Sequence, residues 1–85
     1  MQEKYKLTIR AGERKRDFVR RVLLTQGCIT RNHALRNYIS RLGADILILK
    51  GEGWRIIGAD EVQNSVKTGD YIYTLIEAPQ QQKGA

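Results

Sequence analysis

The sequence predicts a single small α+β domain in which three helices are followed by a β-hairpin. In the first half of the chain, apolar residues recur at the three- and four-residue intervals of a helix. Between residues 54 and 77 they alternate with polar residues, as in a half-buried strand. The length of 85 residues and the apolar share of 41% fit one compact globular core rather than a disordered chain.

The first predicted helix covers residues 13–26 and is amphipathic. Its apolar stripe consists of Phe18, Val19, Val22 and Leu23. The rest of its surface is basic, with Arg14, Lys15, Arg16, Arg20 and Arg21. Basic side chains placed in this way commonly contact backbone phosphates, and the alternative is that they only solvate the helix. Residues 27–29 are expected to form a short extended link to the next helix.

A second, short helix is predicted to begin at Thr30. Its hydroxyl can accept a hydrogen bond from a free backbone N–H of the first turn. His33 stands three residues later, where a capping box would have Glu or Gln, so the expected cap is partial. Asn37 and Tyr38 are expected to end this helix.

A third helix is predicted over residues 39–50. Its apolar stripe, spaced by three and four residues, consists of Ile39, Leu42, Ile46 and Leu49. Gly43 lies on the same stripe, which we interpret as a place where another helix comes close. The opposite face carries Ser40, Arg41, Ala44, Asp45 and Ile48. Residues 46–49 also fit a buried strand, but the periodicity continues back to residue 39 without a turn signal, which favours a helix.

The predicted β-hairpin follows the helices. Residues 54–62 form its first strand, with Trp54 and Ile56 on one face. Residues 64–70 have the composition of a loop, and residues 71–77 alternate as the second strand.

Both ends of the chain are expected to lie outside a domain of residues 13–78. Residues 1–12 alternate apolar and basic side chains, which fits either an N-terminal strand or a basic arm that runs along phosphates. An N-terminal strand would pair with the hairpin or with a second copy of the chain. Pro79 ends the hairpin, and residues 79–85 are predicted to be a disordered tail.

The positive charge is concentrated in the first half of the chain. The net charge is +6, and residues 1–43 hold eleven basic and three acidic side chains, whereas residues 44–85 hold four and six. This asymmetry favours a polyanionic partner, DNA or RNA, over a merely soluble surface. RNA is the less favoured of the two, because the sequence offers no evident aromatic platform for stacking single-stranded bases.

Several other classes of function are not supported by the sequence. Metal sites and catalytic triads need several Cys or His residues, and the chain has only Cys28 and His33. We therefore expect no enzyme activity, no cofactor, no metal and no small-molecule substrate. The single cysteine and the absence of a signal-peptide pattern or a membrane-length apolar run indicate a cytoplasmic protein.

The middle of the chain resembles a known family. The residues that carry the resemblance are Arg41, Leu42, Gly43, Ala44, Ile46, Leu49 and Lys50, followed by Gly53, Trp54 and Ile56. In this pattern the chain is similar to the small winged helix-turn-helix domains of bacteriophages and mobile elements. The resemblance implies DNA binding, with the third helix in the major groove and the hairpin wing, residues 58–70, against the backbone or the minor groove.

A set of DNA-contacting residues follows from these predictions. Arg41 and Ser40 are expected to read bases with Ala44 in the groove, and Asp45 to accept from cytosine. Phosphate and groove contacts are further expected from Arg31, Asn32, Arg36, Asn37 and Tyr38, and from Asn64, Lys67 and Thr68 of the wing.

Two classes of function therefore remain open at this point. The first is a sequence-specific double-stranded DNA-binding protein, such as a small transcriptional regulator or an excisionase-like factor, acting as a homodimer or in tandem copies. The second is a protein-interaction module on the same fold, with Leu47, Ile48 and the tyrosine-containing strand as its contact surface.

Overall fold

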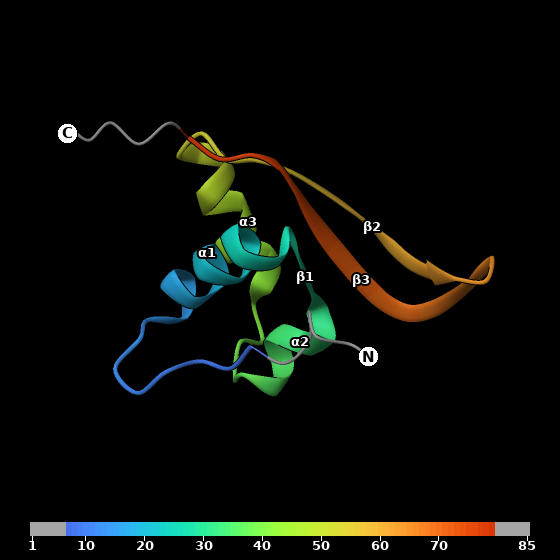
Figure 1. Ribbon diagram of the computed structural model, residues 1–85, viewed down its shortest axis with the longest axis horizontal. Helices are drawn as coiled ribbons and strands as arrows, with labels where there is room; N and C mark the ends of the chain where they lie inside the picture. Colours follow the sequence, from blue (N-terminus) through green and yellow to red (C-terminus); the bar gives the residue numbers. More distant parts are fainter. Residues whose placement is uncertain (1–6, 80–85) are drawn as a thin grey trace.

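Three helices and a three-stranded antiparallel sheet make up residues 7–79, the part of the chain that the computed structural model describes. In chain order the elements are α1 (Lys15–Gln26), β1 (Cys28–Thr30), α2 (Arg31–Arg36), α3 (Leu42–Gly51), β2 (Arg55–Gln63) and β3 (Val66–Glu77). Figure 1 shows the helices gathered at one end of the molecule, while β2 and β3 extend together away from them. The predicted α+β class is confirmed.

Helix α1 buries its predicted apolar stripe completely. Phe18 and Leu23 have no exposed surface and form part of the core. The helix ends at Gly27, which adopts φ 85° and donates its N–H to the carbonyl of Leu23. This left-handed C-cap needs glycine, because a side chain there would strain the backbone.

Helix α2 is capped as predicted. The hydroxyl of Thr30 accepts a hydrogen bond from the N–H of His33 at 3.0 Å, and Thr30 itself is buried. The helix ends before Asn37, and Tyr38 takes the left-handed conformation with φ 66°. Tyr38 is 77% exposed, so a bulky side chain occupies an unfavourable backbone region without contributing to the core.

Helix α3 begins three residues later than predicted. Ile39 is 2% exposed and belongs to the core, as the stripe required, but it lies in an irregular segment before the helix. Arg41, the N-cap, has φ −122° and ψ 49°, which is not helical. The left-handed turn at Tyr38 redirects the chain, so three further residues are needed before Leu42 can start the helix.

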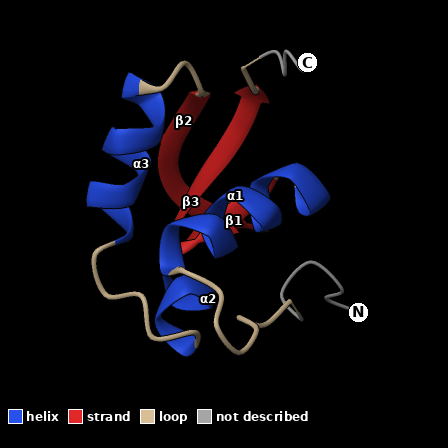
Figure 2. Cartoon of the chain, turned by 90° about the vertical axis from the view of Figure 1, so that its left-hand side faces the viewer, coloured by secondary structure: helices blue, strands red, loops and turns tan. Residues whose placement is uncertain are grey.

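The sheet contains a strand that the sequence did not predict. Residues 27–29 were expected to be a simple link, but Cys28–Thr30 pairs antiparallel with the middle of β3, with Cys28 opposite Thr74 and Thr30 opposite Ile72. The sheet order is therefore β1-β3-β2. Figure 2 shows the helices beside the strands at this end of the molecule.

The hairpin turn is much shorter than the predicted loop of residues 64–70. Only Asn64 and Ser65 connect the strands, and both have positive φ, 53° and 66°, as in a type I′ turn. The remaining residues of the predicted loop belong to β3. Asp60 of β2 pairs with Tyr71, whereas Val62, two residues later, pairs with Lys67, so β3 has additional residues between these pairs. This register shift is a bulge that accommodates Gly69 at φ 90°.

The bulge also fastens the hairpin to α2. Thr68 donates its hydroxyl to the carboxylate of Glu61 across the hairpin, at 2.8 Å. Arg31 donates to the carbonyl of Gly69 at 2.7 Å, and Asp70 accepts from the backbone N–H of Asn32 at 3.0 Å. Asp70 therefore serves as an N-terminal cap of α2 supplied by another element.

The segment before α1 packs against α2 instead of forming a strand. Ile9 donates its N–H to the side-chain carbonyl of Asn37 at 2.8 Å, and His33 Nε2 lies 2.8 Å from the carbonyl of Leu7. Leu7 and Ile9 also pack against the core. Within the described residues 7–12 neither a strand nor a loose arm is present, and residues 1–6 of that prediction lie outside the described part, as do residues 80–85 of the predicted tail.

Tyr71 and Tyr73 pack against Gly58 on the inner face of the hairpin. The rings of Tyr71 and Tyr73 meet edge to face with centroids 5.1 Å apart. A Cβ at Gly58 would lie 2.7 Å from the Tyr71 ring, so this position needs glycine. Gly43 of α3 is exposed, and a Cβ added there would lie 3.5 Å from the Tyr73 hydroxyl. The expected helix contact at Gly43 is thus wrong, because its neighbour is a strand tyrosine.

Candidate nucleic-acid interface

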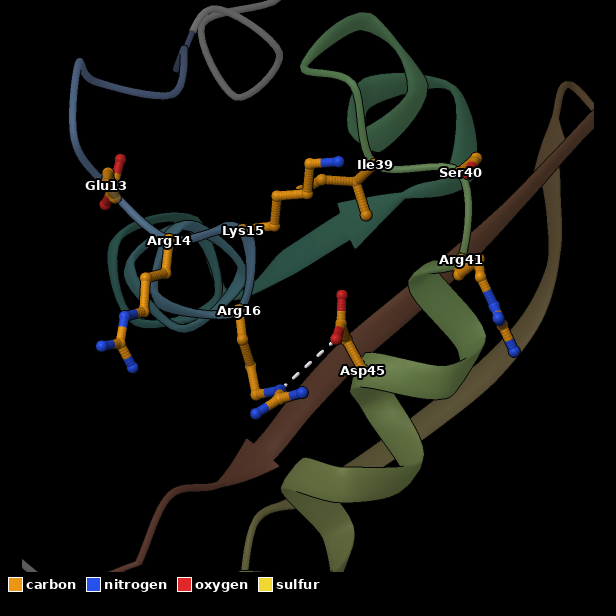
Figure 3. Close-up of a pocket in the computed structure, with 8 residues that line it drawn as sticks. All are labelled: Glu13, Arg14, Lys15, Arg16, Ile39, Ser40, Arg41 and Asp45. Atoms are coloured by element: carbon orange, nitrogen blue, oxygen red, sulfur yellow. Dashed lines mark hydrogen bonds and ion pairs between the residues drawn. The ribbon is translucent and has the colours of Figure 1, made fainter.

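A cleft of about 600 Å³ lies between the start of α1 and the start of α3. Its lining consists of Glu13, Arg14, Lys15, Arg16, Ile39, Ser40, Arg41 and Asp45, and we call this set the cationic cleft. In Figure 3, Lys15 extends from α1 toward the segment that precedes α3. Arg14 and Arg41 lie on opposite sides of the cleft in this view, Arg14 on the side of α1 and Arg41 at the start of α3.

Both carboxylates of the cationic cleft are already paired with arginines. Asp45 lies 3.3 Å from Nε of Arg16, and Glu13 lies 2.9 Å from the guanidinium of Arg21 outside the cleft. Within residues 7–79, three exposed cations of the cleft have no carboxylate partner: Arg14, Lys15 and Arg41. The cleft therefore carries an excess of positive charge that is available to an external anion.

Two helices begin at the cationic cleft, and neither start is capped by a side chain. Arg14 is the N-cap of α1 and Arg41 is the N-cap of α3. The first turn of a helix presents backbone N–H groups without intrahelical partners and the positive end of the macrodipole. Both helix starts thus add to the attraction that the side chains exert on an anion.

One wall of the cleft is held by a pH-sensitive ion pair. Glu13 accepts hydrogen bonds from the Arg21 guanidinium and from the backbone N–H of Arg10, at 2.9 and 3.0 Å. The Arg21 hydrogen bond, followed by the Arg10 N–H, lowers the pKa of Glu13 from 4.5 to about 2. A carboxylate whose pKa is lower in the folded state stabilises the fold above its unfolded pKa and ceases to do so as it is protonated.

We expect the Glu13→Gln variant to unfold at a lower urea concentration than the wild type at neutral pH. The difference in midpoint should shrink as the pH falls below 4.5 and be lost as the pH falls through about 2, where the wild-type carboxylate is protonated in the folded state as well. Urea titrations of both chains across this pH range, followed by circular dichroism, measure the effect. A midpoint difference that stays constant down to about pH 2 would contradict the assignment.

Apart from Lys50 in its last turn, the solvent-facing side of α3 is apolar. Leu47 is 70% exposed and Ile48 is 41% exposed, and the exposed residues Gly43 and Ala44 continue the same surface toward the start of the helix. These side chains provide van der Waals contacts and no hydrogen bonds. If this face meets DNA bases, its preferred contact is the thymine methyl group.

The polar residues expected to read bases are not on the exposed side of α3. Ser40 and Arg41 precede the helix, although both are exposed at the mouth of the cleft. Asp45 is on the helix but faces α1, where it pairs with Arg16, and its side chain is only 17% exposed. Asp45 therefore does not present a free acceptor to a base, contrary to the prediction.

The predicted contacts on α2 divide into exposed and engaged residues. Arg36 and Tyr38 are exposed and accessible to a partner. Arg31 and the backbone of Asn32 are occupied by the hairpin bulge. Asn37 is 4% exposed and its side chain bonds the segment before α1, so it is a structural residue and not a DNA contact.

The hairpin wing carries little positive charge. Lys67 lies 3.4 Å from Asp60, and Thr68 is hydrogen-bonded to Glu61. Across residues 58–70, Lys67 is the one cation against three carboxylates, so the wing is net negative. Of the three predicted wing contacts, Lys67 and Thr68 lie in β3 and are engaged within the hairpin, and Asn64 lies in its two-residue turn.

Sequence reasoning identified the basic surface of α1 but not which of its cations are available. Arg14 and Lys15 are unpaired in the described structure, whereas Arg16 and Arg20 are held by Asp45 and Glu52. No local signal separates the two groups, because Arg16 directly follows Lys15 in the first turn of α1 and is nevertheless paired with Asp45.

None of the helices in the described part of the chain is long and apolar enough to span a bilayer. Within residues 7–79 there is also no cluster of three His, Cys, Asp or Glu residues that would hold a metal ion. Comparison with protein-family models, with curated proteins and with solved structures finds no match to this chain.

Proposed function

We propose that this chain is a winged helix-turn-helix protein that binds double-stranded DNA. The observation that carries the proposal is the cationic cleft, where exposed cations without carboxylate partners meet the starts of two helices. The order of helices and strands and the sheet order β1-β3-β2 support the fold assignment. The sequence resemblance in the region of α3 supports it independently.

In the proposed mode, backbone phosphates bind at the cationic cleft. Lys15 and Arg14 approach from α1, and Arg41 approaches from the start of α3. Phosphate contacts of this kind fix the position of a protein on the duplex but do not select a sequence. Arg36 is exposed on α2 but lies outside the cationic cleft, where it lines a separate pocket with Glu61 and Asp70.

Base recognition in this mode comes from the start of α3. At a specific site, Arg41 can exchange its phosphate contact for a bidentate pair with guanine in the major groove, and Ala44 and Ile48 can contact thymine methyl groups. Asp45 contributes indirectly, because its ion pair with Arg16 holds α3 against α1. The acidic wing is not a primary phosphate contact in this proposal.

We expect the wild-type chain to bind labelled random-sequence duplex DNA with a steep dependence on salt. For about four phosphate contacts, affinity should fall roughly 100-fold between about 50 and about 200 mM monovalent salt, because each contact releases counterions. Fluorescence anisotropy titrations at several salt concentrations measure the slope. Failure to bind duplex DNA at low salt, or preferential binding of an RNA of matched length, would overturn the proposal.

The second candidate is a protein-interaction module. Leu47 and Ile48 favour it, because two large aliphatic side chains are exposed side by side on α3. A protein contact through these residues would bury apolar surface and depend little on salt. The same salt series therefore distinguishes the two functions.

A further inference from the structure

Strand β2 forms an open edge of the sheet. In the order β1-β3-β2, β2 pairs with β3 alone among the described residues. It is nine residues long, whereas the opposite edge strand β1 has three. Both register shifts of the hairpin place the additional residues on β3. The open side of β2 is consequently a long, uninterrupted row of backbone N–H and C=O groups.

This edge lacks several of the features that usually prevent one strand from pairing with another. Edge strands are commonly protected by charged side chains, above all Lys, by Pro or by a bulge. Strand β2 contains no Lys or Pro, the residues added at its register shifts lie on β3, and its charges are of both signs. Ile57 is 58% exposed on its outer face. A groove of about 490 Å³, lined in part by Trp54, Ile56 and Lys50, lies at the start of the strand. An open backbone edge beside an apolar groove is suited to the addition of a strand.

The hydrogen bonds of β3 show which residues of β2 face the open side. Leu75 donates its N–H to the carbonyl of Gly27, so its backbone groups point toward β1. Thr74, the preceding residue, points the other way, toward its partner Ile57 in β2. Because backbone groups alternate along a strand, the open side of β2 presents the N–H and C=O groups of Ile56, Gly58 and Asp60.

We propose that β2 pairs antiparallel with β2 of a second copy of the chain, with a two-fold axis beside Gly58. This register joins the backbone groups of the open side and places each Arg55 opposite Glu61 of the second copy. Ile57 then lies opposite Ala59 of the second copy, so apolar residues occupy the centre. Opposite charges and apolar groups facing one another across antiparallel strands stabilise the pairing.

The same register fills the groove at the start of β2. Val62 of the second copy, which is 54% exposed in the isolated chain, comes opposite Trp54. Asp60 of the second copy comes opposite Ile56, next to Lys50, which lines the same groove. The groove thus receives one apolar and one acidic side chain, matching its own apolar and basic lining.

Neighbouring registers lack this complementarity. With the axis at Ile56, Arg55 would lie opposite Ile57, and with the axis at Asp60, two aspartates would face each other. Like charges directly opposite each other are destabilising. The occupant is inferred to be a second copy because β2 carries both members of the charged pair, at equal distances from Gly58.

Sedimentation equilibrium on the full-length chain without DNA tests the proposal, which does not depend on the proposed function. We expect reversible dimers at about 100 µM, since the pairing of one strand buries a small interface. The single variants Arg55→Glu and Glu61→Arg should each dimerise roughly tenfold or more weakly, because each creates two like-charged pairs. Circular dichroism of each variant checks that it folds like the wild type.

An equimolar mixture of the two single variants provides the decisive control. In a mixed dimer, the two glutamates of the Arg55→Glu chain face the two arginines of the Glu61→Arg chain, so association should return to the wild-type level. The Arg55→Glu/Glu61→Arg double variant should dimerise for the same reason. A wild-type chain that remains monomeric up to about 1 mM, or a mixture that stays as weak as its components, would overturn the proposal. Dimerisation that neither charge reversal weakens would also overturn it.

Discussion

The Lys15→Gln/Arg41→Gln variant is expected to bind random-sequence duplex DNA roughly tenfold or more weakly than the wild type at about 100 mM salt. Both side chains line the cationic cleft, and neither has a carboxylate partner among the described residues. Removing two phosphate contacts should also reduce the slope of log K against log salt by about 2. Anisotropy titrations over the salt series measure both quantities.

A variant with the same change in net charge serves as the control. Arg20→Gln/Lys67→Gln removes two cations that are paired with Glu52 and Asp60, and neither lies on the open edge of β2. Because these cations are already neutralised by carboxylates, we expect a smaller loss of DNA affinity than for the cleft variant. Equal losses in the two double variants would show that binding follows overall charge and that the cationic cleft has no special role.

The Asn37→Ala variant is expected to lower the free energy of unfolding by about 2 kcal/mol. The side chain of Asn37 accepts from the N–H of Ile9 and donates to the carbonyl of His33, at 2.8 and 3.0 Å. Alanine leaves both groups without these partners, and an unsatisfied buried polar group is strongly destabilising. Urea denaturation monitored by circular dichroism measures the loss.

The same substitution in the first turn of α2 provides a matched control. The Asn32 side chain is exposed and makes no hydrogen bond within residues 7–79, and alanine keeps the backbone N–H that donates to Asp70, so Asn32→Ala should change stability by at most about 0.5 kcal/mol. DNA affinity of the folded Asn37→Ala chain should match the wild type. If Asn37→Ala instead left stability unchanged and weakened DNA binding, the residue would be a surface contact, as the sequence had suggested.

The core helices were predictable because their apolar residues are periodic. The stripe of α1 from Phe18 to Leu23 is buried as predicted, and Thr30 caps α2. The start of α3 was not predictable in this way. Ile39 satisfies the helical spacing and is buried, but burial does not require a helical backbone, and the left-handed turn at Tyr38 separates it from the helix.

The errors in the strands have a different cause. Strand β1 has only three residues, all buried, so it shows no alternation that a sequence pattern could reveal. In β3, Thr68, Gly69 and Asp70 have the composition of a loop because they form a bulge. Their hydrogen bonds to Glu61 and α2, rather than their own propensities, keep them in the strand.

The candidate site was predictable in charge but not in detail. Its excess of basic residues is evident from composition, yet the availability of each cation depends on distant carboxylates. Arg16 and Asp45 are 29 residues apart in the chain and 3.3 Å apart in the structure. No local pattern indicates that this pair removes Asp45 from the exposed face of α3 while leaving Lys15 unpaired.

The attachment of the bulge to α2 has a mechanical consequence. The long axis of the molecule measures 44 Å, and the hairpin extends along it beyond the helices (Figure 1). The part of the hairpin nearest the turn is held to α2 at Gly69 and Asp70, so α2 and the hairpin should rotate together as one rigid body. A small tilt of α2 would therefore be magnified into a larger displacement at Asn64 and Ser65, at the far end.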